Sequence, residues 1–229
     1  MEILSLQFLY ALGAIVVIDL MLAGDNAIVI ALAARNVPAH LQKRAIFWGT
    51  VGAIVVRSVM TLAVVWLLRI PGLLFAGGAV LIWIAYKLLL PDGQSAGAHG
   101  GTSASTFWGA MRTIVIADAV MGLDNVLAVA GAAHGSFTLV VVGLLISIPI
   151  VVWGSSIVLK LLERYRWLVH VGVAVLAWTA TKMITGERLL SGFFEANPAA
   201  AYAMYAAVIG GIFAAGAFAA RRRGVLKEA

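Results

Sequence analysis

The sequence predicts an all-α, polytopic membrane protein with seven transmembrane helices, and three observations support this prediction. Of the 229 residues, 63% are hydrophobic and only 11% are charged, whereas soluble domains carry about 25% charged residues. The apolar segments are long enough for helices that cross a bilayer, which need about 20 residues each. The segments of roughly ten residues with alternating polarity that are typical of a membrane β-barrel do not occur.

Seven apolar segments follow one another along the chain. We expect spans at residues 6–34, 44–68, 71–90, 107–133, 137–161, 167–187 and 199–220. The segment "PDGQSAGAHGGTSAS" between the third and fourth spans is rich in Gly, Ala and Ser, as flexible linkers are. We therefore divide the chain into a first repeat (1–90), a flexible linker (91–106), a second repeat (107–190), and a seventh span with a basic tail (191–229).

The distribution of Lys and Arg predicts the orientation. Basic residues gather after spans 1, 5 and 7 and around the linker: Arg35, Lys43, Arg44, Lys87, Arg112, Lys160, Arg164, Arg166, Arg221, Arg222, Arg223 and Lys227. The opposite span ends carry few basic residues, so the positive-inside rule places the N-terminus outside and the C-terminus inside. The first segment lacks the basic start of a signal peptide, and we expect a retained helix in a bacterial cytoplasmic (inner) membrane. The net charge of +6 then reflects topology, and we expect no nucleic-acid partner.

A repeated motif indicates internal symmetry. "VVIDLMLAGDNAIVIALAA" in span 1 aligns without gaps with "VIADAVMGLDNVLAVAGAA" in span 4. This alignment pairs three polar residues of each span: Asp19 with Asp118, Asp25 with Asp124, and Asn26 with Asn125. "WIAYK" in span 3 and "WTATK" in span 6 form a second pair. Three spans per half predict an inverted 3+3 repeat plus a seventh helix, an architecture that places the site of secondary transporters near the midplane.

The four motif aspartates lie well inside spans 1 and 4. Insertion scales assign about 2.5–3.5 kcal/mol to each Asp at a helix centre, so we expect these residues to serve an ion. Gly24 precedes Asp25, and Gly122 stands two residues before Asp124. Because glycine tolerates the dihedral angles of an unwound turn, we predict breaks in both spans that also free carbonyl oxygens for a cation.

The chemistry of this residue set points to a hard or borderline divalent cation. Asn26 and Asn125 add amide oxygens to the carboxylates, although capping a helix end at the break is an equal alternative for them. The chain has no cysteine, and oxygen ligands suit Mg²⁺, Ca²⁺ or Mn²⁺. Met21 and Met121 lie close to the acids and would favour the softer Mn²⁺ as ligands, although simple packing is the preferred interpretation for both.

Arg57 is a cation in the middle of span 2, within "GAIVVRSVM". This depth is too great for comfortable snorkelling to the membrane surface. We expect a structural ion pair with one of the aspartates, and proton coupling is the alternative. The offset that relates the two motifs pairs Arg57 with Ser156, so the symmetry is broken at this position.

On "DLMLAGDNAIVIA", "DAVMGLDNVLAVA" and the seven-span plan, the chain is similar to the TerC family of integral membrane proteins, within the lysine-exporter superfamily. The resemblance covers nearly the whole chain and is strongest to the branch of metal transport proteins. It implies a metal-ion exporter, with Mn²⁺ as the leading substrate. The motif residues that it identifies as the metal site are Asp19, Asp25, Asn26, Asp118, Asp124 and Asn125.

We therefore expect an exporter of a divalent metal ion that works by alternating access, with the metal as substrate and no cofactor. A membrane partner that delivers metal without transport, and an exporter of Ca²⁺ or a small organic cation, are alternatives. An enzyme is not expected, because the chain lacks the G-x-G-D and P-A-L motifs of intramembrane aspartyl proteases. The expected partners are the metal ion and the bilayer, and a homodimer is left open.

Overall fold

The computed structural model describes the backbone of residues 6–35, 37–67, 70–90, 107–133 and 136–227. It describes their side chains except at residues 7, 20–23, 64–65, 124–128, 130, 220 and 222–227. In these ranges the backbone forms eight helices and no strand, which confirms the all-α class. The helices are α1 (Leu6–Ala34), α2 (Ala39–Leu67), α3 (Leu73–Leu89), α4 (Phe107–Ala132), α5 (Phe137–Arg164), α6 (Leu168–Thr185), α7 (Ser191–Ala196) and α8 (Pro198–Lys227).

The seven expected spans correspond to α1–α6 and α8. The largest differences are at the start of α2, which begins at Ala39, and at the end of α8, which continues to Lys227. Both extensions mix charged or polar residues with a few apolar ones, so no continuous apolar run marks them in the sequence. The short helix α7 was not expected, because its six residues are too few to show a periodic pattern.

Several helices are suited to a membrane. In the described residues, four are long and apolar enough to cross it: Ala39–Ala63, Phe137–Arg164, Leu168–Thr185 and Pro198–Ala219. A fifth is obtained when the two segments of the bent helix α1 are taken as one span. The helix α3 is shorter, and residues 124–128 of α4 lie outside this count. The structure thus supports several membrane spans, and the seven-span plan stays a prediction.

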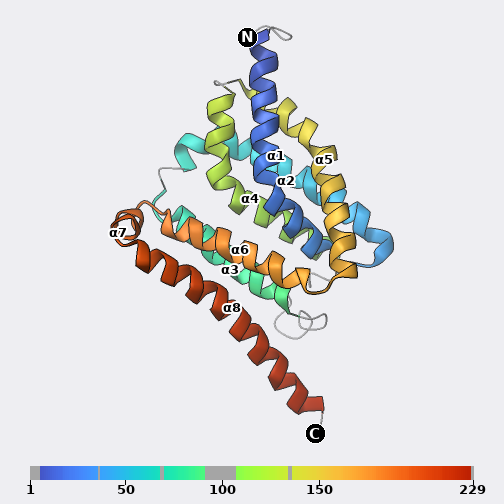
Figure 1. Cartoon of the computed structure of the whole chain (residues 1–229). Helices are drawn as coiled ribbons and strands as arrows, with labels where there is room; N and C mark the ends of the chain where they lie inside the picture. The colour runs from blue at the N-terminus through green and yellow to red at the C-terminus, as the bar shows by residue number, and fades with distance from the viewer. Residues whose placement is uncertain (1–5, 36, 68–69, 91–106, 134–135, 228–229) are drawn as a thin grey trace.

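The helices pack in a defined set of pairs. The first helix α1 lies against α5 and α4, and α2 lies against α4 and α5. The helices α3 and α6 lie side by side and are flanked by α8 (Figure 1). Ile15, Leu32, Ile114 and Leu176 are fully buried between these elements, whereas only 6% of the Pro198–Ala219 segment is buried. The mutual packing of α1, α2 and α4 positions the site described below.

The first helix is bent at the motif. Its segments Phe8–Asp19 and Gly24–Ala34 meet at 51°. The helical backbone nevertheless continues through Gly24, and in α4 it continues through Gly122. Among the described glycines only Gly72 has a positive φ. The change of direction in α1 lies where we expected a break, but the backbone there is a bent helix and not an unwound turn, because a bend spread over one turn can keep most of the helical hydrogen bonds.

A buried carboxylate joins α3 to the end of α6. Glu187, in the turn after α6, is only 3% exposed and accepts hydrogen bonds from the backbone N–H groups of Leu74 (3.0 Å) and Phe75 (3.3 Å). Burial alone would raise the pKa of Glu187, but hydrogen bonds from the backbone of Gly72, Phe75, Leu74 and Arg188 lower it below its ordinary value. The carboxylate that follows α6 thus accepts hydrogen bonds from free N–H groups at the start of α3.

Candidate functional site

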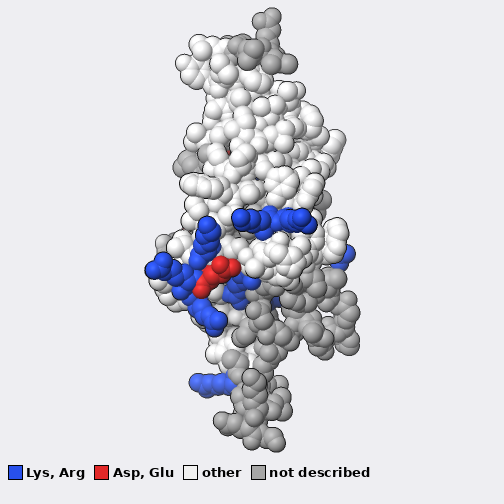
Figure 2. Space-filling model, turned by 90° about the vertical axis from the view of Figure 1, so that its right-hand side faces the viewer, with Lys and Arg blue, Asp and Glu red and all other residues white. Residues whose placement is uncertain are grey.

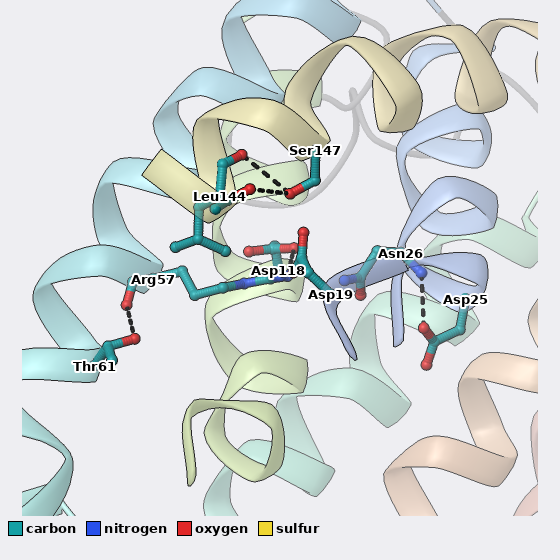
Figure 3. Close-up of polar contacts among 9 residues, drawn as sticks. Asp19, Asp25, Asn26, Arg57, Thr61, Asp118, Leu144 and Ser147 are labelled. Carbon is teal, nitrogen blue, oxygen red and sulfur yellow. Dashed lines mark hydrogen bonds and ion pairs between the residues drawn. The ribbon is translucent and has the colours of Figure 1, made fainter. Parts of the chain in front are cut away.

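Two of the motif aspartates meet at an arginine. Arg57 of α2 extends between α1 and α4, where its Nη1 group donates to Asp19 and its Nη2 group donates to Asp118 (Figure 3). All three side chains are buried. We expected Arg57 to pair with one aspartate, and the structure places it on two, one from each copy of the motif.

The charge of this cluster is unbalanced. Two carboxylates face one guanidinium, which leaves one formal negative charge in a buried place. Removing charges from water costs several kcal/mol per ion, and close pairing with hydrogen bonds offsets this cost only in part. Intramembrane acidic residues are therefore rare and typically mark ion pathways or partner charges. The excess negative charge favours the approach of a further cation.

Several buried polar atoms of the Arg57 cluster and of nearby residues in α1 and α2 have no hydrogen-bond partner in the described part of the chain. In the described part of the chain, the buried side-chain atoms without a partner are Asn26 Oδ1, Thr50 Oγ1, Arg57 Nε and Asp118 Oδ2. Asn26 follows Asp19 by two helical turns and is equally buried. Buried polar groups without partners are uncommon and call for an explanation such as a bound ion or water. Two of these atoms, Asn26 Oδ1 and Asp118 Oδ2, are acceptors of the kind that hard cations take as ligands.

Asp25 lies apart from the arginine cluster. Its carboxylate is half-buried and accepts a hydrogen bond from the backbone N–H of Asn26, at 3.0 Å (Figure 3). The side chains of Met21, Asp124 and Asn125 lie outside the described residues. Within the described residues, no group of three or more His, Cys, Asp and Glu is placed to hold a metal ion. The structure thus brings together Asp19 and Asp118, and it leaves the complete four-aspartate site as a prediction.

Gly122 and Met121 have roles in packing. A Cβ atom at Gly122 would lie 3.6 Å from Nε of Arg57, so the missing side chain leaves room for the arginine beside α4. Met121 is 4% exposed and belongs to the main hydrophobic core. At Gly24, by contrast, a Cβ atom would meet nothing within 4 Å. The glycine beside the second motif therefore lies against Arg57 in an unbroken helix, where a methyl group would make an ordinary contact.

Two buried hydroxyl groups near the cluster were not singled out from the sequence. Thr61 Oγ1 donates to the carbonyl of Arg57 (2.8 Å), and Ser147 Oγ donates to the carbonyls of Gly143 and Leu144 (3.1 Å each), as Figure 3 shows. These bonds to the preceding turn of the same helix satisfy both hydroxyls. The only signal in the sequence is a small hydroxyl residue within an apolar segment, which is too common to identify a site.

Apolar helices that enclose a buried Asp–Arg–Asp cluster define an integral membrane protein with a charged intramembrane site. The chain belongs to the integral membrane protein TerC family, whose model matches residues 4–224. It is 45% identical over 187 residues to the membrane protein YjbE of Bacillus subtilis. The aligned region covers 82% of this chain and 84% of YjbE. No solved structure matches the chain.

More distant relatives are also membrane proteins. The chain is 24% identical over 200 residues to the inner membrane protein YgdQ of Escherichia coli, covering 80% of this chain and 81% of YgdQ. It is 25% identical to the membrane protein YkoY of Bacillus subtilis, covering 79% of this chain and 61% of YkoY. Together with the apolar helices, these relatives are consistent with a multi-pass inner membrane protein.

Proposed function

We propose that the protein exports a divalent metal cation, with Mn²⁺ as the leading substrate, through a site built from the motif residues of α1 and α4. The ligands in this proposal are Asp19, Asp25, Asn26, Asp118, Asp124 and Asn125. The single observation that carries it is the buried cluster in which one guanidinium faces two carboxylates. Such a concentration of negative charge inside apolar helices is unfavourable unless a cation uses it.

Charge and ligand type support a divalent ion. When all four motif aspartates are ionised, Arg57 leaves three formal negative charges, and one divalent cation neutralises two of them. The unpartnered acceptors Asn26 Oδ1 and Asp118 Oδ2 are oxygens, which Mn²⁺, Mg²⁺ and Ca²⁺ accept as ligands. Transport needs no enzyme activity and no cofactor, and the metal is the substrate.

The packing of the helices supports the inverted repeat. Exchanging α1 with α4, α2 with α5 and α3 with α6 turns the close pair α1–α5 into the close pair α4–α2. A Cβ at Gly143 of α5 would lie 2.5 Å from Ile15 of α1, and a Cβ at Gly49 of α2 would lie 2.7 Å from Ile114 of α4. Ile15 and Ile114 are equivalent in the gapless alignment of the two motifs. The two halves thus make the same contact twice.

The same symmetry changes the residue of α5 that is taken as equivalent to Arg57. Aligning Gly49 with Gly143 also aligns Thr61 with Ser155, and each of these hydroxyls donates to the carbonyl four residues earlier. Those carbonyls belong to Arg57 and Val151. With this alignment the position equivalent to Arg57 would be Val151 in place of Ser156, since α2 and α5 follow the motifs at slightly different distances. The site would lie where the two halves meet, as in transporters built from inverted repeats.

The surface charge supports the proposed orientation. Figure 2 shows Lys and Arg side chains in the lower part of one face, below a broad surface without charged groups. The start of α2 and the end of α5 lie at the same end of the bundle and carry the exposed residues Lys43, Arg44, Lys160 and Arg164 (Figure 1). Under the positive-inside rule this end is cytoplasmic, which leaves the N-terminus outside and the C-terminus inside.

Transport in liposomes that contain only this protein tests the proposal. We expect the wild-type protein to release trapped Mn²⁺, and Asp118→Asn to slow the release at least tenfold. Glu195→Gln, on the exposed helix α7, is the matched control and keeps the wild-type rate. Absence of Mn²⁺ release by intact wild-type protein would contradict the proposal and favour a partner that handles metal without transporting it.

A further inference from the structure

We infer that Arg57 is a built-in substitute for the transported cation: it occupies Asp19 and Asp118 while the carrier is empty and gives way when metal binds. The inference rests on the proposed function and adds to it a mechanism for the return of the empty carrier. It starts from the finding that the same two carboxylates serve the arginine and belong to the proposed ligand set.

The contacts of the guanidinium fit a temporary occupant. Arg57 holds one oxygen of each aspartate, and the described hydrogen bonds of its guanidinium go to these two carboxylates. Its Nε group is buried without a partner. A guanidinium is a planar fork of donors that stays charged, so it bridges two carboxylates well. Since the two carboxylates hold it, their transfer to a metal ion removes its main attachment.

The aliphatic part of the Arg57 side chain has space beside α4. Gly122 faces the side chain of Arg57, with Nε and Cγ at 3.6 Å and 3.9 Å from the place of a Cβ atom. A larger residue there would fill the space in which the stem lies. Because the cluster joins α1, α2 and α4, a change of partner at Arg57 reaches all three helices at once.

Arg57 lowers the electrostatic cost of the ionised carboxylates in the empty carrier. Bare carboxylates are unfavourable inside a membrane, so an empty site with several ionised aspartates resists the rearrangement that returns it to the loading side. With Arg57 on Asp19 and Asp118, one of these negative charges is balanced without metal, and both carboxylates keep a cationic partner. A carrier that can return empty performs net export. A carrier that returns only when loaded performs exchange.

The place of Asp25 agrees with this state. Its described hydrogen bond comes from the backbone N–H of Asn26, and it is not a partner of Arg57 as Asp19 and Asp118 are. The bend between Phe8–Asp19 and Gly24–Ala34 lies between the two aspartates of α1. A change of this angle would alter the position of Asp25 relative to Asp19. The described arrangement is thus the one expected with Arg57 in place of metal.

The experiment compares net release with exchange in liposomes. Arg57→Met removes the charge and keeps an unbranched apolar stem, Arg57→Lys keeps a charge, and Val59→Ala is a control at an exposed position of the same helix. We expect Arg57→Met to slow net Mn²⁺ release at least tenfold while exchange of radiolabelled for unlabelled Mn²⁺ stays within threefold of wild type. We also expect Arg57→Met to bind Mn²⁺ more tightly, because a competing cation is gone, and Arg57→Lys to retain net release.

The outcomes distinguish the proposed export of Mn²⁺ from the proposed role of Arg57 as a substitute cation. If the wild-type protein neither binds nor exchanges Mn²⁺, the proposed function is wrong, and the inference is wrong with it. If the wild type exchanges Mn²⁺ but Arg57→Met loses exchange and net release together, or binds Mn²⁺ less tightly, Arg57 is a structural residue and only the inference is overturned. If Arg57→Met does not fold, Arg57→Gln, which removes the charge and keeps hydrogen-bond donors, supplies the same comparison of Mn²⁺ binding, net release and exchange.

Discussion

Ile15 of α1 and Gly143 of α5 touch so closely that no side chain fits between them. A Cβ atom at Gly143 would lie 2.5 Å from Cγ2 of Ile15, which is fully buried. Contacts of this kind let two helix backbones approach, as small residues do in membrane helix pairs. Asp19 follows Ile15 by four residues, about one turn of α1. The packing of α1 against α5 therefore determines where the carboxylate of Asp19 lies.

Gly143→Ala should destabilise the protein by about 1–3 kcal/mol, because added volume in a packed interface forces the neighbours apart. We expect a lower thermal unfolding midpoint in detergent, measured by intrinsic fluorescence. Gly154→Ala, on the same helix, is the matched control, because a Cβ atom there meets nothing within 4 Å. An equal loss of stability in both variants would contradict the proposed importance of the contact.

Arg57→Met should destabilise the metal-free protein by about 3–5 kcal/mol, because removing one partner leaves the other charges buried and unpaired. Adding Asp19→Asn and Asp118→Asn to this variant removes those charges and should recover much of the lost stability. Thermal unfolding with and without Mn²⁺ checks this prediction. Mn²⁺ should raise the midpoint of Arg57→Met more than that of the wild type, and no recovery in the triple variant would show that the cluster acts through shape and not through charge.

Gly122→Leu should lower stability more than Gly122→Ala. The Cβ atom of alanine makes an ordinary contact with Arg57 at 3.6 Å, whereas a leucine fills the space in which the arginine stem lies. Overpacking of this kind costs about 1–3 kcal/mol. Thermal unfolding of both variants gives the comparison. Equal midpoints would indicate that the Arg57 side chain has another position available.

Glu187→Gln should remove a pH-dependent part of the stability. The pKa of Glu187 is lower in the folded protein than its ordinary value of 4.5. The ionised group therefore stabilises the fold above that pH, and its contribution is lost as the pH falls through the lower folded-state pKa. The midpoint difference between the wild type and Glu187→Gln should shrink between neutral pH and about pH 3. A difference that stays constant across this range would contradict this role, and Glu195→Gln is the exposed control.

The sequence predicted most of the helices because membrane helices are marked by long apolar runs, and α1–α6 and α8 match them. It also singled out Arg57, since a charge in the middle of such a run is rare. It did not predict that Arg57 reaches Asp19 and Asp118 together, because that depends on how α1 and α4 pack around α2. A glycine at a break and a glycine within a continuous helix look alike in a sequence, and the helical backbone continues through Gly122.

Under the proposed inverted repeat, the arginine of α2 has an apolar residue, Val151, at the equivalent place in α5. In a carrier made of two identical inverted halves, the inward-open and outward-open states would be related by a two-fold rotation about an axis in the membrane plane and would have equal energy. A single guanidinium in one half removes that degeneracy, since it travels with α2 and not with α5. The resting carrier would then prefer one side of the membrane, and a directional preference would be present before any driving gradient is applied.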